Sequence, residues 1–211
     1  CPILTSGSAT ITSDCILYSQ IVVTGKLNVT GIPDAQGNLP KIIGSGSNRL
    51  FKVENGGELV VKSLNLTGGN IDTEGGAINV AAGTLMSTDS FFVNNRASLN
   101  DVGLGGAIYG VNGAVLHFVN STFTNNYAGH HGGAIYMSGG SATLSVRNSV
   151  IDRNGAKYGG AGILCNYGTC TVLKSIIHDN QVLAQTNYRG GAAFWVVYSG
   201  KLILVESIVS N

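Results

Sequence analysis

Charged residues and prolines are scarce in this chain. Among 211 residues, Asp, Glu, Lys and Arg together make up 11%, and proline occurs three times; an average soluble protein is about 25% charged. The net charge is +1 and no basic run exists, so we expect no nucleic-acid partner, because such binding relies on clustered Lys and Arg. No window of about 18 apolar residues occurs either, so we expect no membrane-spanning helix.

Glycine is abundant instead, and it recurs in a pattern. Five Gly-Gly-Ala copies begin at Gly75, Gly105, Gly132, Gly159 and Gly190, in steps of 30, 27, 27 and 31 residues. A second motif, Ser-x-apolar-x-x-Asn, runs in phase with the first. Its copies begin at Ser63, Ser90, Ser121, Ser149, Ser175 and Ser207; in the first, Gly68 replaces the Asn, and the last is cut off at Asn211. Repetition at this period predicts a stacked solenoid.

The residue types decide which solenoid. Gly, Ser, Asn and Thr interrupt every window, so no 3.6-residue apolar period survives and helical repeats are excluded. Short β-rich runs bounded by Gly or Asn remain, and three such strands per coil would fill the repeat. We therefore expect an all-β, right-handed parallel β-helix of about seven coils, with its handedness taken from the crossover rule. We expect one continuous domain, in which residues 57–211 form regular coils and residues 1–56 form atypical, capping coils.

Stacked coils turn each repeat position into a ladder. Two ladders should fill the core: Phe92, Phe123, Ile151, Ile177 and Val209 in one, and Leu85, Leu116, Leu144 and Leu202 with Cys170 in the other. The motif asparagines Asn95, Asn126, Asn154 and Asn180 should form a stacked amide ladder. The position before each motif Ser is always polar and should face solvent: Lys62, Asp89, Asn120, Asn148, Lys174 and Glu206.

Two positions that flank this polar one are unexpectedly apolar. One comprises Val61, Thr88, Val119, Arg147, Leu173 and Val205, and the other Leu64, Phe91, Thr122, Val150, Ile176 and Ile208. Either one of them turns inward at a corner, or both form an outward lateral contact surface. The candidate interface residues are Val119, Thr122, Val150, Leu173, Ile176, Val205 and Ile208.

Cysteines and sequons favour an oxidising, extracellular setting. Cys1 and Cys15, and Cys165 and Cys170, are close enough in sequence to form disulfides, although four cysteines allow three pairings. Metal binding is the competing interpretation, and neither Cys spacing nor a nearby His pair supports it. Sequons begin at Asn28, Asn65 and Asn120. Asn120 is the best glycan acceptor because of its exposed position, whereas Asn65 falls nearer the core.

The paired motifs resemble a known repeat. Gly105-Gly-Ala-Ile108, Gly132-Gly-Ala-Ile135, Phe92-Val-Asn-Asn95 and Phe123-Thr-Asn-Asn126 are similar to the polymorphic outer-membrane protein repeats of chlamydial surface autotransporters, which also occur in algal and protist surface proteins. The resemblance covers about residues 57–211. It implies a pectin-lyase-like right-handed β-helix and an adhesive or other cell-surface role, while the sequons suit a secreted eukaryotic protein equally well.

Residues for chemistry are few. Asp152-Arg153 and His178-Asp179 occupy the same position of adjacent coils and form the one ionisable cluster that the pattern brings together, as a solvated edge or as a catalytic group. His130-His131 precedes a Gly-Gly corner, as an exposed pair or as metal ligands. An aromatic patch of Trp195 and Tyr198 with Tyr188 and Arg189 is either packing or a platform for sugar rings.

We therefore expect a non-catalytic, secreted or cell-surface structural or adhesive module without cofactor or metal. Self-association, end to end or lateral and up to filaments, is the expected partner interaction, with glycans as a second partner class. The alternatives are a polysaccharide lyase, hydrolase or epimerase, and a glycan-binding module. Because the last motif stops at Asn211, either the natural chain continues or something else covers that end.

Overall fold

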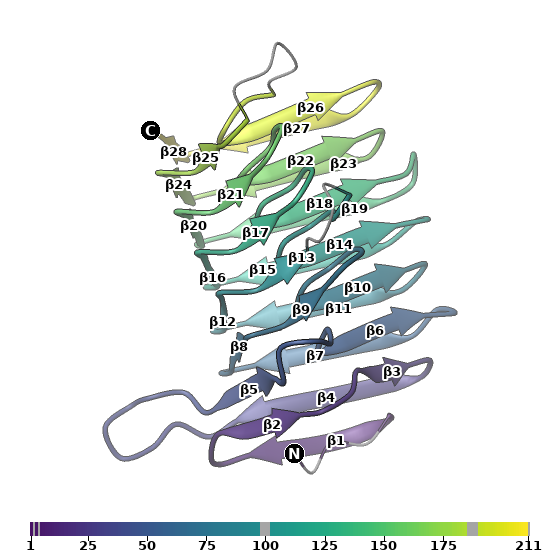
Figure 1. Cartoon of the computed structure of the whole chain (residues 1–211), viewed down its shortest axis with the longest axis vertical. Helices are drawn as coiled ribbons and strands as arrows, with labels where there is room; N and C mark the ends of the chain where they lie inside the picture. Colours follow the sequence, from purple (N-terminus) through teal and green to yellow (C-terminus); the bar gives the residue numbers. More distant parts are fainter. Residues whose placement is uncertain (2, 4, 98–101, 185–189, 211) are drawn as a thin grey trace.

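The chain folds as a parallel β-solenoid of about seven turns, which confirms the predicted fold class. The computed structural model describes residues 1, 3, 5–97, 102–184 and 190–210, and no helix occurs among them. The coils stack along the long axis of the molecule, with the two chain ends at opposite ends of the stack (Figure 1).

The strands form four sheets, A to D, in which all pairs are parallel. Sheet A contains β1 (Gly7–Ile11), β4 (Lys26–Gly31), β7 (Glu58–Lys62), β11 (Thr84–Thr88), β15 (Val115–Val119), β19 (Thr143–Arg147), β23 (Thr169–Leu173) and β27 (Lys201–Val205). Sheet B contains β2 (Cys15–Leu17), β5 (Lys41–Gly44), β8 (Asn65–Thr67), β12 (Phe91–Val93), β16 (Thr122–Thr124), β20 (Val150–Asp152), β24 (Ile176–His178) and β28 (Ile208–Val209). Sheet C contains β3 (Ile21–Val23), β6 (Phe51–Glu54), β10 (Ile78–Ala81), β14 (Ile108–Val111), β18 (Ile135–Ser138), β22 (Ile163–Asn166) and β26 (Phe194–Val197). Sheet D contains β9 (Asn70–Ile71), β13 (Arg96–Ala97), β17 (Tyr127–Ala128), β21 (Gly155–Ala156) and β25 (Gln181–Val182).

A regular coil therefore has four strands, not the three that the repeat length predicts. The additional strand lies in sheet D, spans two residues and directly follows the motif Asn. Two residues carry too little periodicity to be recognised from sequence, so this strand was missed. The coils before β9 have no counterpart of it among the described residues, and the division into residues 1–56 and 57–211 stays a prediction.

Single left-handed residues make the corners of each coil. Between sheets A and B this residue is Ser63, Asp89, Asn120, Asn148, Lys174 or Glu206, with φ between 47° and 52°. Between sheets B and D it is Asn94, Asn125, Arg153 or Asp179. Asn and Asp tolerate this conformation better than other non-glycine residues, which explains the polar residue at each corner. The corners stack because each coil turns at the same place as the next.

The predicted ladders form part of the core, together with a buried sheet C row that contains Ile78, Ile108, Ile135 and Ile163. Phe92 and Phe123 stack with ring centroids 4.6 Å apart, and Phe118 meets Phe123 edge-on at 4.9 Å. Ile151 and Ile177 continue the phenylalanine row and are fully buried. Leu85, Leu116, Leu144, Cys170 and Leu202 pair in register along sheet A. In the last coil, inward positions such as Leu204 and Val209 are 46% and 43% exposed.

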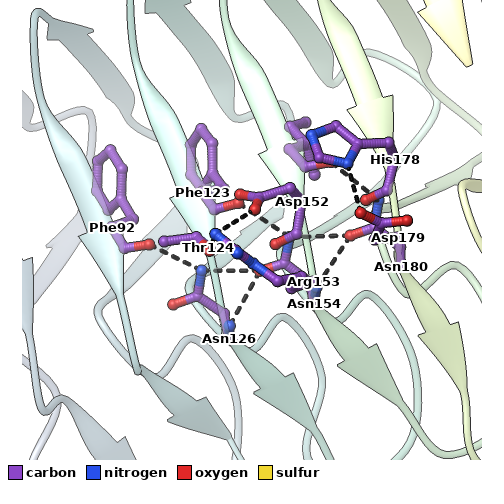
Figure 2. Close-up of polar contacts among 11 residues, drawn as sticks. Phe92, Phe123, Thr124, Asn126, Asp152, Arg153, Asn154, His178, Asp179 and Asn180 are labelled. Carbon is purple, nitrogen blue, oxygen red and sulfur yellow. Dashed lines mark hydrogen bonds and ion pairs between the residues drawn. The ribbon is translucent and has the colours of Figure 1, made fainter.

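The motif asparagines form a continuous buried amide ladder (Figure 2). The Nδ2 of Asn126 donates to the Phe92 carbonyl of the preceding coil at 2.9 Å and to Asn154 Oδ1 of the following coil at 2.9 Å. Its Oδ1 accepts from the backbone N–H and the Nδ2 of Asn95. Each amide thus satisfies backbone groups at a corner that sheet pairing cannot reach.

The motif serines form a second, parallel ladder. Ser149 Oγ donates to the Arg147 carbonyl and accepts from the backbone N–H of Ser121 in the preceding coil. Ser175 repeats both contacts with the next pair of coils. This inward-turned hydroxyl explains why Ser recurs at the motif start, a role that spacing alone did not reveal.

The strand pairing corrects the register of the first Ser copy. Lys62 pairs with Thr88 and Asn65 with Phe91, so Ser63 takes the corner position of Asp89 and not that of Ser90. The expected corner residue Lys62 is therefore wrong, and Gly69 rather than Gly68 stands where later coils have Asn, since its N–H donates to Asn95 Oδ1. Val61 and Leu64 are fully buried for the same reason.

The last two Gly-Gly copies are also out of register by one residue. Ile135 pairs with Ile163 and Ile163 pairs with Phe194, so Gly160 follows Gly75, Gly105 and Gly132 as the left-handed corner glycine. Gly159 instead pairs with His131, in a row that begins with Glu74 and Leu104. Glycine therefore occupies the position of that row at Gly159, and Gly190 of the next coil lies beside it.

Two disulfides and one insertion complete the chain. The structure pairs Cys1 with Cys15, and Cys165 with Cys170 across the corner from β22 to β23. The segment between β4 and β5 projects away from the stack (Figure 1). Hydrogen bonds from Asn38 hold its turn on Asp34 and lower the pKa of that carboxyl.

Replacing Asn126 with Ala should destabilise the fold by about 2–4 kcal/mol, because buried groups of two neighbouring coils lose their partners. Urea unfolding followed by far-UV circular dichroism measures this. The matched control is Asn125→Gly, which keeps the left-handed corner and should change stability by less than about 1 kcal/mol. Equal effects of the two variants would contradict a special role for the amide ladder.

Candidate functional site

With Lys62 and Asn65 in place of Val61 and Leu64, the two predicted rows both lie on the outside of the solenoid. Thr122 pairs with Val150, Val150 with Ile176 and Ile176 with Ile208 along sheet B. Val119, Leu173 and Val205 belong to the adjoining edge row of sheet A, together with Thr88 and Arg147. The alternative that one row turns inward at the corner is wrong, because the inward residue there is the motif Ser.

Every residue of the sheet B row from Phe91 onwards is at least partly exposed, and Ile208 is the most exposed. Phe91 is 41% exposed, Thr122 and Val150 are half-buried, Ile176 is 41% exposed and Ile208 is 61% exposed. No charged side chain interrupts this row between Phe91 and Ile208, a stretch that the structure describes throughout. It is a flat apolar surface that crosses five consecutive coils.

The expected ionisable cluster is assembled on the same sheet (Figure 2). Asp152 pairs with His178 in the strand register, as the repeat predicts. Asp152 is buried, and its Oδ2 lies 2.6 Å from the guanidinium of Arg153. His178 Nδ1 lies 2.8 Å from Asp179 Oδ2. Each carboxylate thus contacts a basic side chain of its own coil, Arg153 for Asp152 and His178 for Asp179.

A cavity of about 400 Å³ opens on the outer face of sheet C. Its lining comes from three coils and consists of His131, Tyr136, Leu164, Asn166, Trp195, Val197 and Tyr198. Tyr136, Leu164 and Trp195 follow one another in the strand register. Tyr109 extends this row on the next strand and stacks on Tyr136, with centroids 5.3 Å apart. The expected pair Trp195 and Tyr198 is therefore part of a larger aromatic site, while Tyr188 and Arg189 lie outside the described residues.

The misregistered glycines make room for the tryptophan. A Cβ at Gly159 would lie 2.5 Å from Trp195 Cε3, and one at Gly190 would lie 2.1 Å from Trp195 Cδ2. Because both side chains are missing, the indole lies against the turn and meets the ring of His131 edge-on at 4.6 Å. Of the expected His130-His131 pair, His131 lines the cavity and His130 does not.

Two buried polar atoms of the cavity lining have no hydrogen-bond partner, namely His131 Nδ1 and Asn166 Oδ1. The Nδ2 of Asn166 donates to Ser138 Oγ at 3.1 Å, and the Oδ1 of the same amide has no partner. Buried acceptors without a partner are rare in folded proteins and call for an explanation.

Burial controls the charge of this face. Desolvation lowers the pKa of His131 to about 4, the nearby His130 adds to the effect, and a hydrogen bond to the backbone of Gly159 opposes it. Near pH 7 the imidazole is therefore neutral, so one ring nitrogen is a donor and the other an acceptor. Burial raises the pKa of Tyr109 to about 12, with smaller contributions from Glu74 and Tyr136. The phenol thus stays protonated.

Two stacked tyrosines, Tyr167 and Tyr198, lie directly after strands β22 and β26 of sheet C, and Tyr198 lines the cavity. Tyr167 and Tyr198 lie 4.8 Å apart with an interplanar angle of 8°, and 44% and 79% of their surfaces are exposed. Both have left-handed backbones, at corners where the earlier coils have Asn55, Ala82 and Asn112. A left-handed aromatic residue costs about 1–2 kcal/mol. The disulfide between Cys165 and Cys170 spans the corner that carries Tyr167.

A second cavity, of about 700 Å³, lies between the insertion and sheet B. Thr12, Asp14, Ile32, Lys41 and Phe91 are among its lining residues, and Asp14 and Lys41 approach each other within 3.6 Å. Asn65 also lines it, so the expectation that this asparagine falls nearer the core is wrong: Leu66 faces inward instead.

The sequons stay predicted glycan acceptors. Asn120 lies at a corner, where its Nδ2 donates to Asp89 Oδ1 at 3.1 Å, and its side chain is exposed. Asn28 is half-buried on the outer face of sheet A.

One structural residue escaped sequence reasoning. Arg49 is 8% exposed and donates to the Glu74 carbonyl at 2.7 Å and to Thr73 Oγ1 at 3.1 Å. Its burial lowers the pKa of the guanidinium, and the charge of Glu74 counteracts this. Arg49 thereby fixes the turn at the start of the row that His131 continues. A lone Arg between two apolar runs carries no signal of this role.

Within the described part of the chain, no group of three or more His, Cys, Asp or Glu residues is placed to hold a metal ion. These residues also contain no helix that is long and apolar enough to cross a membrane.

The low pKa of His131 predicts a pH-dependent stability. The unfolded imidazole binds a proton near pH 6.5 and the folded one only near pH 4, so stability is complete above pH 6.5 and falls as the pH drops towards 4. Because the side chain is half-exposed, we expect a loss of about 1 kcal/mol. Urea midpoints between pH 7 and 4 should show this loss, and His131→Leu, which copies Leu104 of the preceding coil, should reduce it. His117→Asn on the outside of sheet A is the control, and an identical pH dependence in both variants would exclude His131 as the source.

Comparisons with known proteins agree with the repeat assignment. Residues 120–138 match the Chlamydia polymorphic membrane protein repeat and contain one copy of each motif. Over 135 residues, 64% of this chain, the sequence is 34% identical to metabotropic glutamate receptor-like protein R of Dictyostelium discoideum, covering 8% of that protein. Over 142 residues, also 64% of this chain, it is 29% identical to the probable autotransporter YfaL of Escherichia coli (strain K12), covering 11%. The chain thus spans about a tenth of the length of these curated relatives. It carries a repeat of the Chlamydia polymorphic membrane protein type, built into a parallel β-solenoid.

Proposed function

We propose that this chain is a non-catalytic β-solenoid displayed at a cell surface, where it acts as a structural or adhesive module. The observation that carries the proposal is the regular solenoid of a membrane-protein repeat type, in whose predicted ionisable cluster each carboxylate contacts a basic side chain of its own coil. The similarity to an autotransporter and the two disulfides support an extracytoplasmic location.

The surface best suited to contact with a partner is the row Phe91, Thr122, Val150, Ile176 and Ile208. A flat apolar row of this length is costly in water, and a second copy of the chain presents the same spacing between coils. Two copies placed side by side in antiparallel fashion would cover both rows with equivalent contacts. Lateral self-association is therefore the contact that we propose first.

End-to-end association is the second route. Leu204 and Val209 are exposed inward positions, and β26, β27 and β28 have no further strand beside them among the described residues, so a further coil or another copy would cover this cross-section. Repeated heterologous contacts of this kind produce filaments. Electron microscopy separates the two routes, because lateral pairs keep the length of one solenoid and filaments do not.

Replacing Val150 and Ile176 together with Lys should abolish lateral association, since two buried charges would face each other across the contact. Both side chains point away from the core, so the monomer should stay folded. Light scattering over a range of protein concentrations measures association, and circular dichroism checks the fold. The control is Ser145→Lys and Thr171→Lys on the outer face of sheet A; a wild-type chain that is monomeric at every concentration would refute the lateral contact.

Surface display has a direct test in the cells that make the protein. An antibody against the folded chain should label intact cells, and protease added outside should remove the signal. Labelling that requires permeabilised cells would place the chain inside and would contradict the proposed location. Neither result depends on whether the chain associates with itself.

A further inference from the structure

We propose that the cavity on the outer face of sheet C binds a neutral oligosaccharide. This inference goes beyond the structural role proposed above and does not depend on self-association. It rests on the shape, composition and unpaired polar atoms of one cavity, all within the described residues.

The lining has the chemistry that sugar rings require. Trp195, Tyr136 and Tyr198 provide aromatic faces for the apolar sides of pyranose rings, and His131 and Asn166 provide polar groups between them. No residue of the lining carries a charge near neutral pH, because the pKa of His131 is lowered. A volume of about 400 Å³ is within the range of small-ligand sites. A charged ligand would find no counter-ion in this lining.

The unpaired atoms specify hydrogen-bond donors on the ligand. Asn166 Oδ1 is an acceptor, His131 Nδ1 is an acceptor in the tautomer that carries its proton on Nε2, and both atoms are buried without a partner. Sugar hydroxyl groups can donate to them while the rings lie on the aromatic faces. An apolar ligand would leave both polar atoms unsatisfied and would therefore bind more weakly.

The repeat is broken just where the cavity forms. Gly159 and Gly190 leave out the side chains that the row of Glu74, Leu104 and His131 would continue, and Trp195 uses the space. Tyr167 and Tyr198 replace the Asn or small residues of earlier corners despite their left-handed backbones. Residues held in costly conformations at a surface cavity point to a function other than folding.

The aromatic row also suggests the direction of the ligand. Tyr136 and Tyr109 continue it from the cavity over the preceding coils, along the axis of the solenoid. An oligosaccharide longer than one ring would therefore extend from Trp195 towards Tyr109. The longest members of an oligosaccharide series should bind best.

The chain contains a single tryptophan, so its fluorescence reports on the site directly. The probes are cellohexaose, maltohexaose and chitohexaose, with hexagalacturonate as a charged comparison. We expect at least one neutral hexamer to shift or quench the emission of Trp195 in a saturable manner and more strongly than its trimer. No change with any neutral hexamer at millimolar concentration would overturn the proposal, as would binding of hexagalacturonate alone.

Two variants test the site without disturbing the fold. Tyr198→Asn copies Asn112 of an earlier corner, and Asn166→Ser copies Ser138, its partner in β18. Each should weaken binding about tenfold or more, while Tyr198→Asn should keep or raise the urea midpoint because Asn suits the left-handed corner. Tyr18→Ala, at an 81% exposed tyrosine of the first coil, is the control and should bind like the wild type.

The variants also separate this site from any other. Unchanged affinity in both Tyr198→Asn and Asn166→Ser would mean that the sugar binds elsewhere, and the inference would be wrong. Isothermal titration calorimetry with Trp195→Ala, checked for its fold by circular dichroism, should show no heat of binding. If Trp195→Ala still shows a heat of binding, the proposed site would be wrong as well.

Discussion

The structure depends on one constraint: every coil must turn at the same corners as the coil before it. Parallel pairing satisfies the backbone within the sheets, and backbone bonds between coils continue at the corner residues, but the N–H groups of the motif Ser and Asn have no backbone acceptor in the next coil. The buried Ser and Asn ladders fill this gap, because each side chain bonds to its own coil and to a neighbouring one. The core shares this alignment, since Phe92 stacks on Phe123 in the same two coils in which Asn95 donates to Asn126.

This constraint also explains how far the sequence could be interpreted. The Asn ladder, the Phe row and the solenoid class were predictable, because Asn and Phe are specific residues at a steady interval. The registers at Ser63 and Gly159 were not, because serine serves both as a corner residue and as an inward hydroxyl, and a glycine pair offers two candidates for one left-handed position. Only the strand pairing decides between such alternatives, and that pairing depends on contacts between coils.

The cavity was predictable only in part. Trp195 and Tyr198 are close in sequence and were recognised as an aromatic pair. Their partners His131, Tyr136 and Asn166 come from earlier coils, and their convergence depends on the corrected register at Gly159. The left-handed backbone of Tyr198 can be inferred from the sequence only after Tyr198 is aligned with Asn112 and the other residues at the same corner. An error of one residue therefore hides the site while leaving the fold class unchanged.

In a repeat protein, the residues that maintain the fold and those that serve a ligand follow opposite rules. The fold favours the same residue in every coil, as in the Asn ladder, because each copy satisfies its neighbour. A ligand site needs a departure from the repeat, and any departure costs stability at a stacked corner. Here the departures at Gly159, Tyr167, Gly190 and Tyr198 gather around one cavity and are braced by one disulfide. Random drift of the repeat would scatter such changes over all faces; their concentration on sheet C is the reason to assign that face a ligand.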